Sequence, residues 1–220
     1  MKRIVAKTSA SSCLNLTVIQ SIKLMLEHDH YSLLKAIRGC TLCQKDLPLG
    51  PRPIVQFSPL SKILIIGQAP GSAVHESGIP WNDPSGDRMR EWLGINKAIF
   101  FDPDQIALVP MGFCYPGSRD RGGDNPPRVE CAPAWHEKVL ALTHCVELTI
   151  LTGSYAQQAY MMDVASLTMT ERVKAWKDVA PKVMPLPHPS WRVVGWMKKN
   201  TWFEQELLPS LKNTVQNALA

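Results

Sequence analysis

The stretch KILIIGQAPG, residues 62–71, joins a short apolar run to a tight loop of glycine and proline. A continuous apolar run that ends at glycine is typical of a strand buried in a parallel sheet. Three later segments have the same character: IALVP at 106–110, LTILTG at 148–153 and KVMPLP at 182–187. We therefore expect four strands of similar environment.

Segments of helical character lie between these strands, at 88–93, 135–142, 154–162 and 170–179, and a closing helix is expected over 202–219. This alternation predicts an α/β fold: a three-layer sandwich with a central, mostly parallel four-stranded sheet and helices on both faces. In such sheets ligands bind at the carboxyl ends of the strands. The distinctive loops all follow predicted strands, so we expect them to form one site.

The chain has 220 residues, of which 45% are hydrophobic, as expected for one globular domain. We place this domain at residues 31–220 and an N-terminal extension or helix at residues 1–30. Apolar residues recur at helical spacing between Val18 and Ile37, whereas residues 1–16 show no clear period. No apolar run is long enough for a membrane-spanning helix, so no membrane association is expected.

The net charge of +5 permits attraction to phosphate groups but does not establish it. The cysteines are unevenly spaced, unlike those of a secreted disulfide scaffold, and no signal cleavage site is evident near the N-terminus. We expect a cytoplasmic protein that acts as a monomer.

Four cysteines form a pattern of their own: Cys40 and Cys43 in CTLC, then the more widely spaced Cys114 and Cys131. Four thiolates can hold an iron–sulfur cluster or a zinc ion. Cysteine is also a common small buried residue, and a CxxC pair can be redox-active. From the residues alone, these interpretations remain open.

Taken together, the motifs resemble the uracil-DNA glycosylase superfamily, and within it the iron–sulfur branch called family 4, over about residues 33–215. The first family motif reads roughly G-E-x-P-G and is followed by G-x-P-F; here residues 67–71 read GQAPG and residues 78–81 read GIPW. The second motif is H-P-S or H-P-A, and residues 188–190 read HPS. The cysteine order also fits.

The resemblance implies an enzyme that acts on DNA containing a damaged or deaminated base. Such an enzyme flips the base out of the duplex and hydrolyses its N-glycosidic bond. No lysine nucleophile is indicated, so no strand-cleaving step is expected. The resemblance also implies a [4Fe–4S] cluster, with zinc as the alternative, on Cys40, Cys43, Cys114 and Cys131.

By the same resemblance, His188 donates to the departing base as negative charge develops there; the alternative is a loop-capping histidine. Gln68 can hold the base or the attacking water, or merely stabilise its loop, but an amide cannot act as a general base. Asp83 is the carboxylate that could orient water, and Asp87 is expected to cap the following helix. The expected base-binding residues are Gly67, Ala69, Gly71 and Trp81.

DNA contacts are expected after the histidine. Ser190 and Arg192 can bind phosphates, and Trp191 can enter the gap left by the flipped base. The loop at 115–128 carries arginines that either contact phosphate or pair with Asp120 and Asp124; these are Arg119, Arg121 and Arg128.

Three positions depart from the family 4 pattern. Gln68 replaces its glutamate, Trp81 its phenylalanine, and Pro110 stands where the family has an asparagine that reads uracil. These departures leave the substrate base open. They also leave open a non-catalytic relative that binds nucleic acid, or a small-molecule hydrolase on the same fold.

Overall fold

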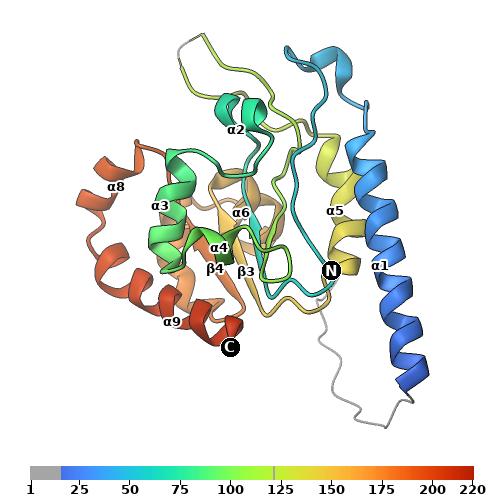
Figure 1. The fold of residues 1–220 in the computed structure, drawn as a ribbon. Helices are drawn as coiled ribbons and strands as arrows, with labels where there is room; N and C mark the ends of the chain where they lie inside the picture. Colours follow the sequence, from blue (N-terminus) through green and yellow to red (C-terminus); the bar gives the residue numbers. More distant parts are fainter. Residues whose placement is uncertain (1–15, 121) are drawn as a thin grey trace.

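The computed structural model describes residues 16–120 and 122–220 as a sheet enclosed by helices (Figure 1). The strands are β1 (Ile63–Ile66), β2 (Ile106–Leu108), β3 (Leu148–Thr152) and β4 (Val183–Leu186). They form a parallel four-stranded sheet in the order β2-β1-β3-β4. The predicted sheet is confirmed, with each strand slightly shorter than expected.

The register brings the four strand ends to one edge of the sheet. Ile63 lies opposite both Ile106 and Leu148, and Thr149 lies opposite Val183. Because all the strands run in the same direction, the loops that follow them leave from the same edge.

Helices occupy the connections and both ends of the described chain. They are α1 (Leu16–Arg38), α2 (Ser72–Ser77), α3 (Pro84–Leu93), α4 (Lys97–Phe100), α5 (Cys131–Leu142), α6 (Ser154–Tyr160), α7 (Met169–Lys174), α8 (Val193–Lys199) and α9 (Leu208–Leu219). Short 3₁₀ turns lie at Gln44–Asp46, Met162–Val164 and Ala175–Asp178, and a π-helical turn at Phe203–Leu207.

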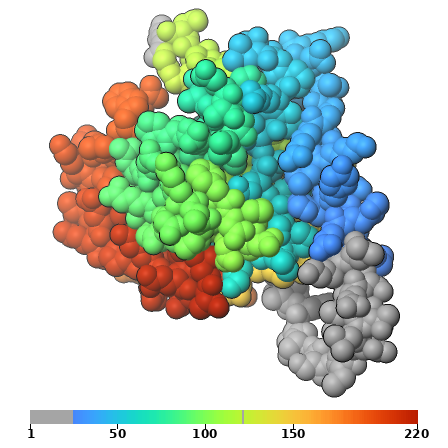
Figure 2. Space-filling view, in the orientation of Figure 1, coloured from blue at the N-terminus to red at the C-terminus, as the bar shows by residue number. Residues whose placement is uncertain are grey.

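Alternate residues of each strand point into two separate cores. Ile65, Leu108 and Ile150 belong to one, with apolar residues of α3 and α9. Leu64, Ala107 and Leu151 belong to the other, with residues of α1, α5 and α6. Figures 1 and 2 show α1 and the C-terminal helices on opposite sides of the molecule. The strands are therefore apolar on both faces, and the three-layer sandwich is confirmed.

The N-terminal helix is continuous across the expected boundary between residues 30 and 31. His30 Nε2 forms a hydrogen bond of 2.7 Å with the carbonyl oxygen of Phe57, and the two rings meet edge to face. The expectation for residues 1–15 lies outside the described residues. In the part of the chain that the structure describes, no helix is long and apolar enough to span a bilayer.

Two prolines sit where the backbone tolerates them. Pro185 lies in β4, which is an edge strand, so its missing N–H does not interrupt the centre of the sheet. Pro209 lies in the first turn of α9, directly after the π-helical turn, so the expected closing helix is continuous but begins with a π-helical turn.

A fully buried glutamine joins the ends of β3 and β4. Gln157 Nε2 donates to the carbonyl oxygens of Leu151 at 3.3 Å and Leu186 at 2.9 Å. Its Oε1 accepts from Nε of Arg172, which is only 1% exposed. This side chain therefore fixes the strand ends from which the last two loops emerge.

Replacing Gln157 by Leu should lower the free energy of unfolding by about 1–3 kcal/mol, because Arg172 and two carbonyl groups lose a buried partner. Urea denaturation measures this change. The exposed neighbour Gln158→Leu is the matched control and should change stability by no more than about 0.5 kcal/mol. Equal losses in the two variants would contradict the assigned network.

Candidate active site

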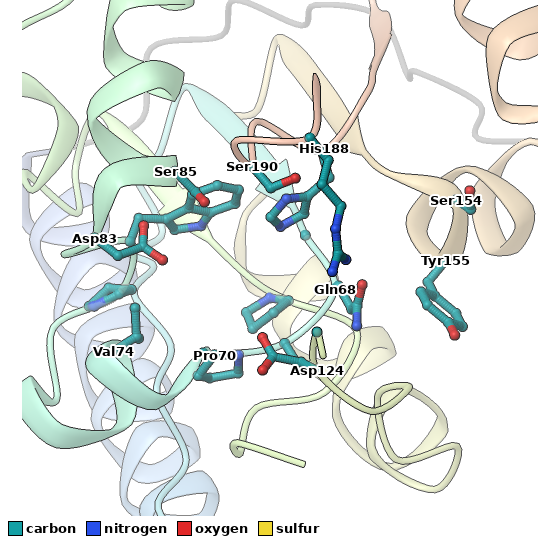
Figure 3. Close-up of a pocket in the computed structure, with 18 of the residues that line it drawn as sticks. Gln68, Pro70, Val74, Asp83, Ser85, Asp124, Ser154, Tyr155, His188 and Ser190 are labelled. Atoms are coloured by element: carbon teal, nitrogen blue, oxygen red, sulfur yellow. The ribbon is translucent and has the colours of Figure 1, made fainter. Parts of the chain in front are cut away.

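A cleft of about 680 Å³ opens at the carboxyl edge of the sheet (Figure 3). The loops after β1 and β4 and the start of α6 line it, together with the loop before α5. The residues predicted for catalysis and base binding, and those predicted for DNA contact after the histidine, lie on its wall: Gly67, Gln68, Ala69, Gly71, Trp81, Asp83, His188, Ser190, Trp191 and Arg192.

Neighbouring loops at this edge are hydrogen-bonded to one another. The N–H of Met111 donates to the Gly67 carbonyl at 2.9 Å, and the N–H of Gly112 donates to the Gln68 carbonyl at 3.0 Å. On the other side, Arg88 Nη1 donates to the Pro189 carbonyl at 2.7 Å. The histidine loop is thus held by α3 as well as by its own strand.

Trp81 and His188 stack beside each other, with ring centroids 6.0 Å apart and planes inclined by 20°. Burial lowers the pKa of His188, and the negative charge of Asp83 opposes this effect. The lowered pKa keeps the imidazole neutral at neutral pH, so it has one N–H available as a donor.

Trp81 adopts a left-handed backbone conformation with φ of 56°, which is unusual for a large side chain. Two glycines make room for it. A Cβ on Gly67 would lie 3.0 Å from the indole ring, and a Cβ on Gly86 would lie only 1.8 Å from the Trp81 carbonyl oxygen. Gly86 was not predicted as a site residue, since no sequence pattern shows this close approach.

Asp83 is the N-cap of α3, because its Oδ1 accepts from the Gly86 N–H at 2.8 Å. The expectation that Asp87 caps this helix is wrong. The helix begins earlier, at Pro84, whose φ suits the first helical position. Asp87 instead forms an ion pair with Arg90 at 2.5 Å.

The Gln68 side chain reaches the loop that precedes α5. Its Nε2 donates to the carbonyl oxygen of Asn125 at 3.0 Å. The Asn125 side chain in turn donates to the Pro116 carbonyl at 3.1 Å. Gln68 therefore stabilises this loop and also lines the cleft, and its contact with a base or water stays a prediction.

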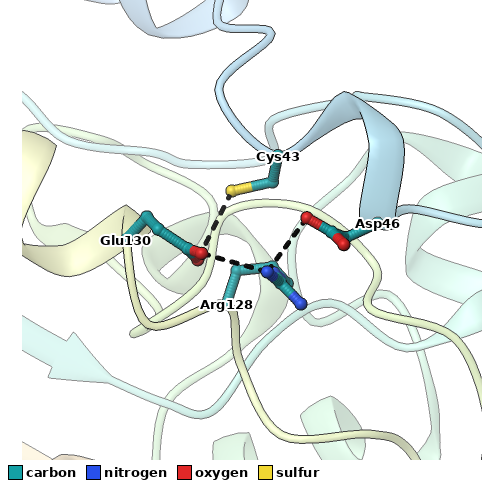
Figure 4. A network of polar contacts seen from close by, with 4 residues as sticks. All are labelled: Cys43, Asp46, Arg128 and Glu130. Carbon is teal, nitrogen blue, oxygen red and sulfur yellow. Dashed lines mark hydrogen bonds and ion pairs between the residues drawn. The ribbon is translucent and has the colours of Figure 1, made fainter.

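The arginines of the 115–128 loop lie in different parts of the molecule. Arg119 lines the cleft. Arg128 lies on the cysteine side, where it pairs with Asp46 and Glu130, each at 3.0 Å (Figure 4). Arg128 is thus not at the cleft, and its acidic partners differ from those expected. The expectation for Arg121 lies outside the described residues.

Several further residues line the cleft that sequence reasoning did not select: Ser154, Tyr155, Gln158 and Asp124. The position of Ser154 and Tyr155 directly after β3 was a usable signal. Asp124 lies in a long loop and gave no such signal.

The rim of the cleft carries an exposed aromatic ring. Trp191 is 74% exposed, and the Arg192 guanidinium lies 5.3 Å from the centroid of its ring. A ring and a cation at the mouth of a cleft can contact a base and a phosphate of a nucleic acid.

A second pocket, separate from the cleft, is lined by the cysteines predicted as metal ligands: Cys40, Cys43, Cys114 and Cys131. Burial raises the pKa of the Cys114 thiol to about 11 and that of Cys131 to about 12. Cys43 Sγ donates to Glu130 Oε2 at 3.9 Å (Figure 4). Among residues 16–120 and 122–220, no group of three or more histidine, cysteine or acidic side chains is arranged to hold a metal ion.

The geometry and the motifs agree with a comparison to known families. Residues 54–212, well over half of the chain, match the family model of the uracil DNA glycosylase superfamily. The chain therefore belongs to the uracil-DNA glycosylase superfamily, whose members are generally DNA-repair glycosylases that act as hydrolases.

Replacing Gly86 by Ala should lower the free energy of unfolding by about 1–3 kcal/mol, because the new methyl group meets the Trp81 backbone. Chemical denaturation followed by tryptophan fluorescence measures it. Gly195→Ala in α8 is the control: no atom lies within 4 Å of its Cβ position, so stability should be unchanged or rise by about 1 kcal/mol. A Gly86→Ala protein as stable as the control would disprove the close approach.

Proposed function

We propose that this protein removes a damaged or deaminated base from DNA as a monofunctional glycosylase, by hydrolysing the N-glycosidic bond of a flipped nucleotide. The observation that carries this proposal is the convergence of Gln68, Trp81 and His188 on one cleft at the carboxyl edge of the sheet. Its volume of about 680 Å³ lies in the range of small-ligand pockets.

His188 supplies the main chemical step in this proposal. Cleavage of the bond drives negative charge onto the leaving base, and a donor aimed at that charge stabilises the transition state more than the ground state. The imidazole is neutral because its pKa is lowered, and its one N–H is the donor to the leaving base. The Trp81 ring beside it offers a face for the extruded base.

The residues that follow His188 contact the DNA strand from which the base is extruded. Ser190 and Arg192 bind phosphate oxygens, and the exposed Trp191 ring fills the stack where the base has left. Arg119 adds a cation on another wall of the same cleft.

Pro110, on the wall of the cleft, supports either a substrate base other than uracil or a protein without catalytic activity. Pro110 has no side-chain amide to read a base edge, and its carbonyl oxygen is 2.9 Å from His136 Nε2. Burial lowers the pKa of His136, so this neutral ring can donate to that carbonyl. The second candidate function, a nucleic-acid-binding relative without turnover, rests on this observation.

We further propose that the protein belongs to the iron–sulfur branch and that Cys40, Cys43, Cys114 and Cys131 hold a [4Fe–4S] cluster, with zinc as the alternative. The four thiols line one pocket, and a cluster separates its cysteine sulfurs more widely than a single ion does. The cluster would tie the end of α1 to the start of α5. We also propose that the protein acts as a monomer in the cytoplasm, a reducing compartment in which cysteines remain available as ligands.

Oligonucleotides bearing uracil, hypoxanthine or xanthine test the main proposal. The wild-type protein should release at least one of these bases and leave an abasic site without strand cleavage. His188→Gln should slow release by a factor on the order of 10²–10³, because a donor to the developing charge is lost, while DNA binding remains.

The control is His144→Gln, which removes an exposed imidazole that does not line the cleft and should leave base release unchanged. Salt-dependent DNA binding with no release from any substrate would favour the non-catalytic relative. Turnover of free nucleosides with no DNA binding would contradict both.

Iron and acid-labile sulfide analysis tests the cluster. Protein purified without oxygen should contain about four of each per chain, as expected for [4Fe–4S]. Cys43→Ser should lose most of both, whereas Cys145→Ser, at an exposed free cysteine, should retain them. Stoichiometric zinc without sulfide would support the alternative, and equal metal loss in both variants would contradict the assigned ligands.

A further inference from the structure

Hydrolysis of a glycosidic bond needs a water molecule that gives up a proton as it attacks. Gln68 cannot accept that proton, since an amide is not a base near neutral pH. In the described residues, the acidic side chains on the cleft wall are Asp83 and Asp124. Figure 3 shows both carboxylates turned into the same hollow.

The two carboxylates differ in their hydrogen-bond partners. Asp83 Oδ1 accepts from the N–H of Gly86 and caps α3. Within residues 16–120 and 122–220, no hydrogen bond or ion pair to the Asp124 carboxylate is present. Asp124 is therefore the carboxylate whose oxygens are open to water in the cleft.

The backbone that carries Asp124 is held in place despite its position in a long loop. Ser118 and Asp124 form an antiparallel bridge, and Arg119 N–H donates to the Gly123 carbonyl at 2.8 Å. Asn125 follows directly, and its backbone is fixed from both sides: its N–H donates to Gly117 at 2.8 Å and its carbonyl accepts from Gln68. Gln68 thus anchors the loop that carries the Asp124 carboxylate.

Asp124 also lies against the first motif. Its Oδ2 is 3.6 Å from the position that a Cβ on Gly71 would occupy. Partial removal of water by the cleft walls and the charge of Asp83 raise the pKa of Asp124, while Arg192 acts in the opposite direction. A carboxylate of raised pKa is a better proton acceptor than an ordinary aspartate.

We propose that Asp124 is the general base that accepts a proton from the attacking water, a proposal that rests on the glycosylase function proposed above. The water oxygen forms a bond to the sugar C1′, and its proton passes to the Asp124 carboxylate. The bond from C1′ to the base nitrogen breaks, and its electron pair leaves with the base, which the His188 N–H stabilises. Asp124 then returns the proton to solvent.

Asp124→Asn tests the proposal because it keeps the size of the side chain and removes the basic oxygen. With the base that the wild type releases, the single-turnover rate should fall by a factor on the order of 10²–10⁴. DNA affinity should stay equal or rise, since a negative charge facing DNA is removed. Asp120→Asn, an exposed change in the same loop with the same loss of charge, should match the wild type in rate.

The pH profile distinguishes a base from a structural loop residue. Base release by the wild type should weaken as the pH falls and Asp124 becomes protonated, and this acid limb should be lost in Asp124→Asn, because an amide does not titrate. The charged or titratable groups that share its cleft are Asp83, Arg119, Tyr155, His188 and Arg192. The Asp83→Asn variant, which retains a capping oxygen, should keep the limb but move it to lower pH, because the charge that raises the pKa of Asp124 is removed.

A single-turnover rate of Asp124→Asn within a few-fold of an active wild type would overturn this inference and leave the glycosylase function standing. A wild type that releases no base would overturn both. An equal loss in Asp120→Asn would show a charge effect of the loop and would also overturn the inference.

Discussion

The parallel pairing of four short strands is the constraint on which the candidate site depends. It brings residues that are far apart in sequence, from Gln68 to His188, to one edge of the sheet. Backbone hydrogen bonds between adjacent loops, such as Gly112 N–H to the Gln68 carbonyl, then fix their relative positions. Both faces of the strands pack against a core, so a slip of one residue in the register would exchange the side chains of the two cores and displace the loop that follows.

The cleft and the cysteine pocket share a stretch of backbone. Gly112 donates to the carbonyl of Gln68 on one side and lines the cysteine pocket on the other. Cys114 follows two residues later, and Cys131 Sγ accepts from the Phe113 N–H at 3.2 Å. A group bound by the thiols would therefore stiffen the wall behind the first motif without contacting the base.

Much of this arrangement could be predicted from the sequence because its signals are local. Apolar runs ending at glycine or proline predicted the strands, and their order predicted that GQAPG and HPS meet. Other features depend on contacts between distant segments. The left-handed conformation of Trp81 needs Gly86, the capping role of Asp83 needs the helix to begin at Pro84, and the place of Asp124 needs the Gln68 side chain. No residue pattern reports such contacts before the chain is folded.

The most direct test of the account is a crystal structure of the protein bound to an oligonucleotide that carries a hydrolysis-resistant 2′-fluoro deaminated nucleotide. We expect an extruded base against Trp81, within hydrogen-bonding distance of His188, and the strand backbone along Ser190 and Arg192. A base that stays stacked in the DNA, or one bound outside the cleft at the carboxyl edge of the sheet, would contradict it.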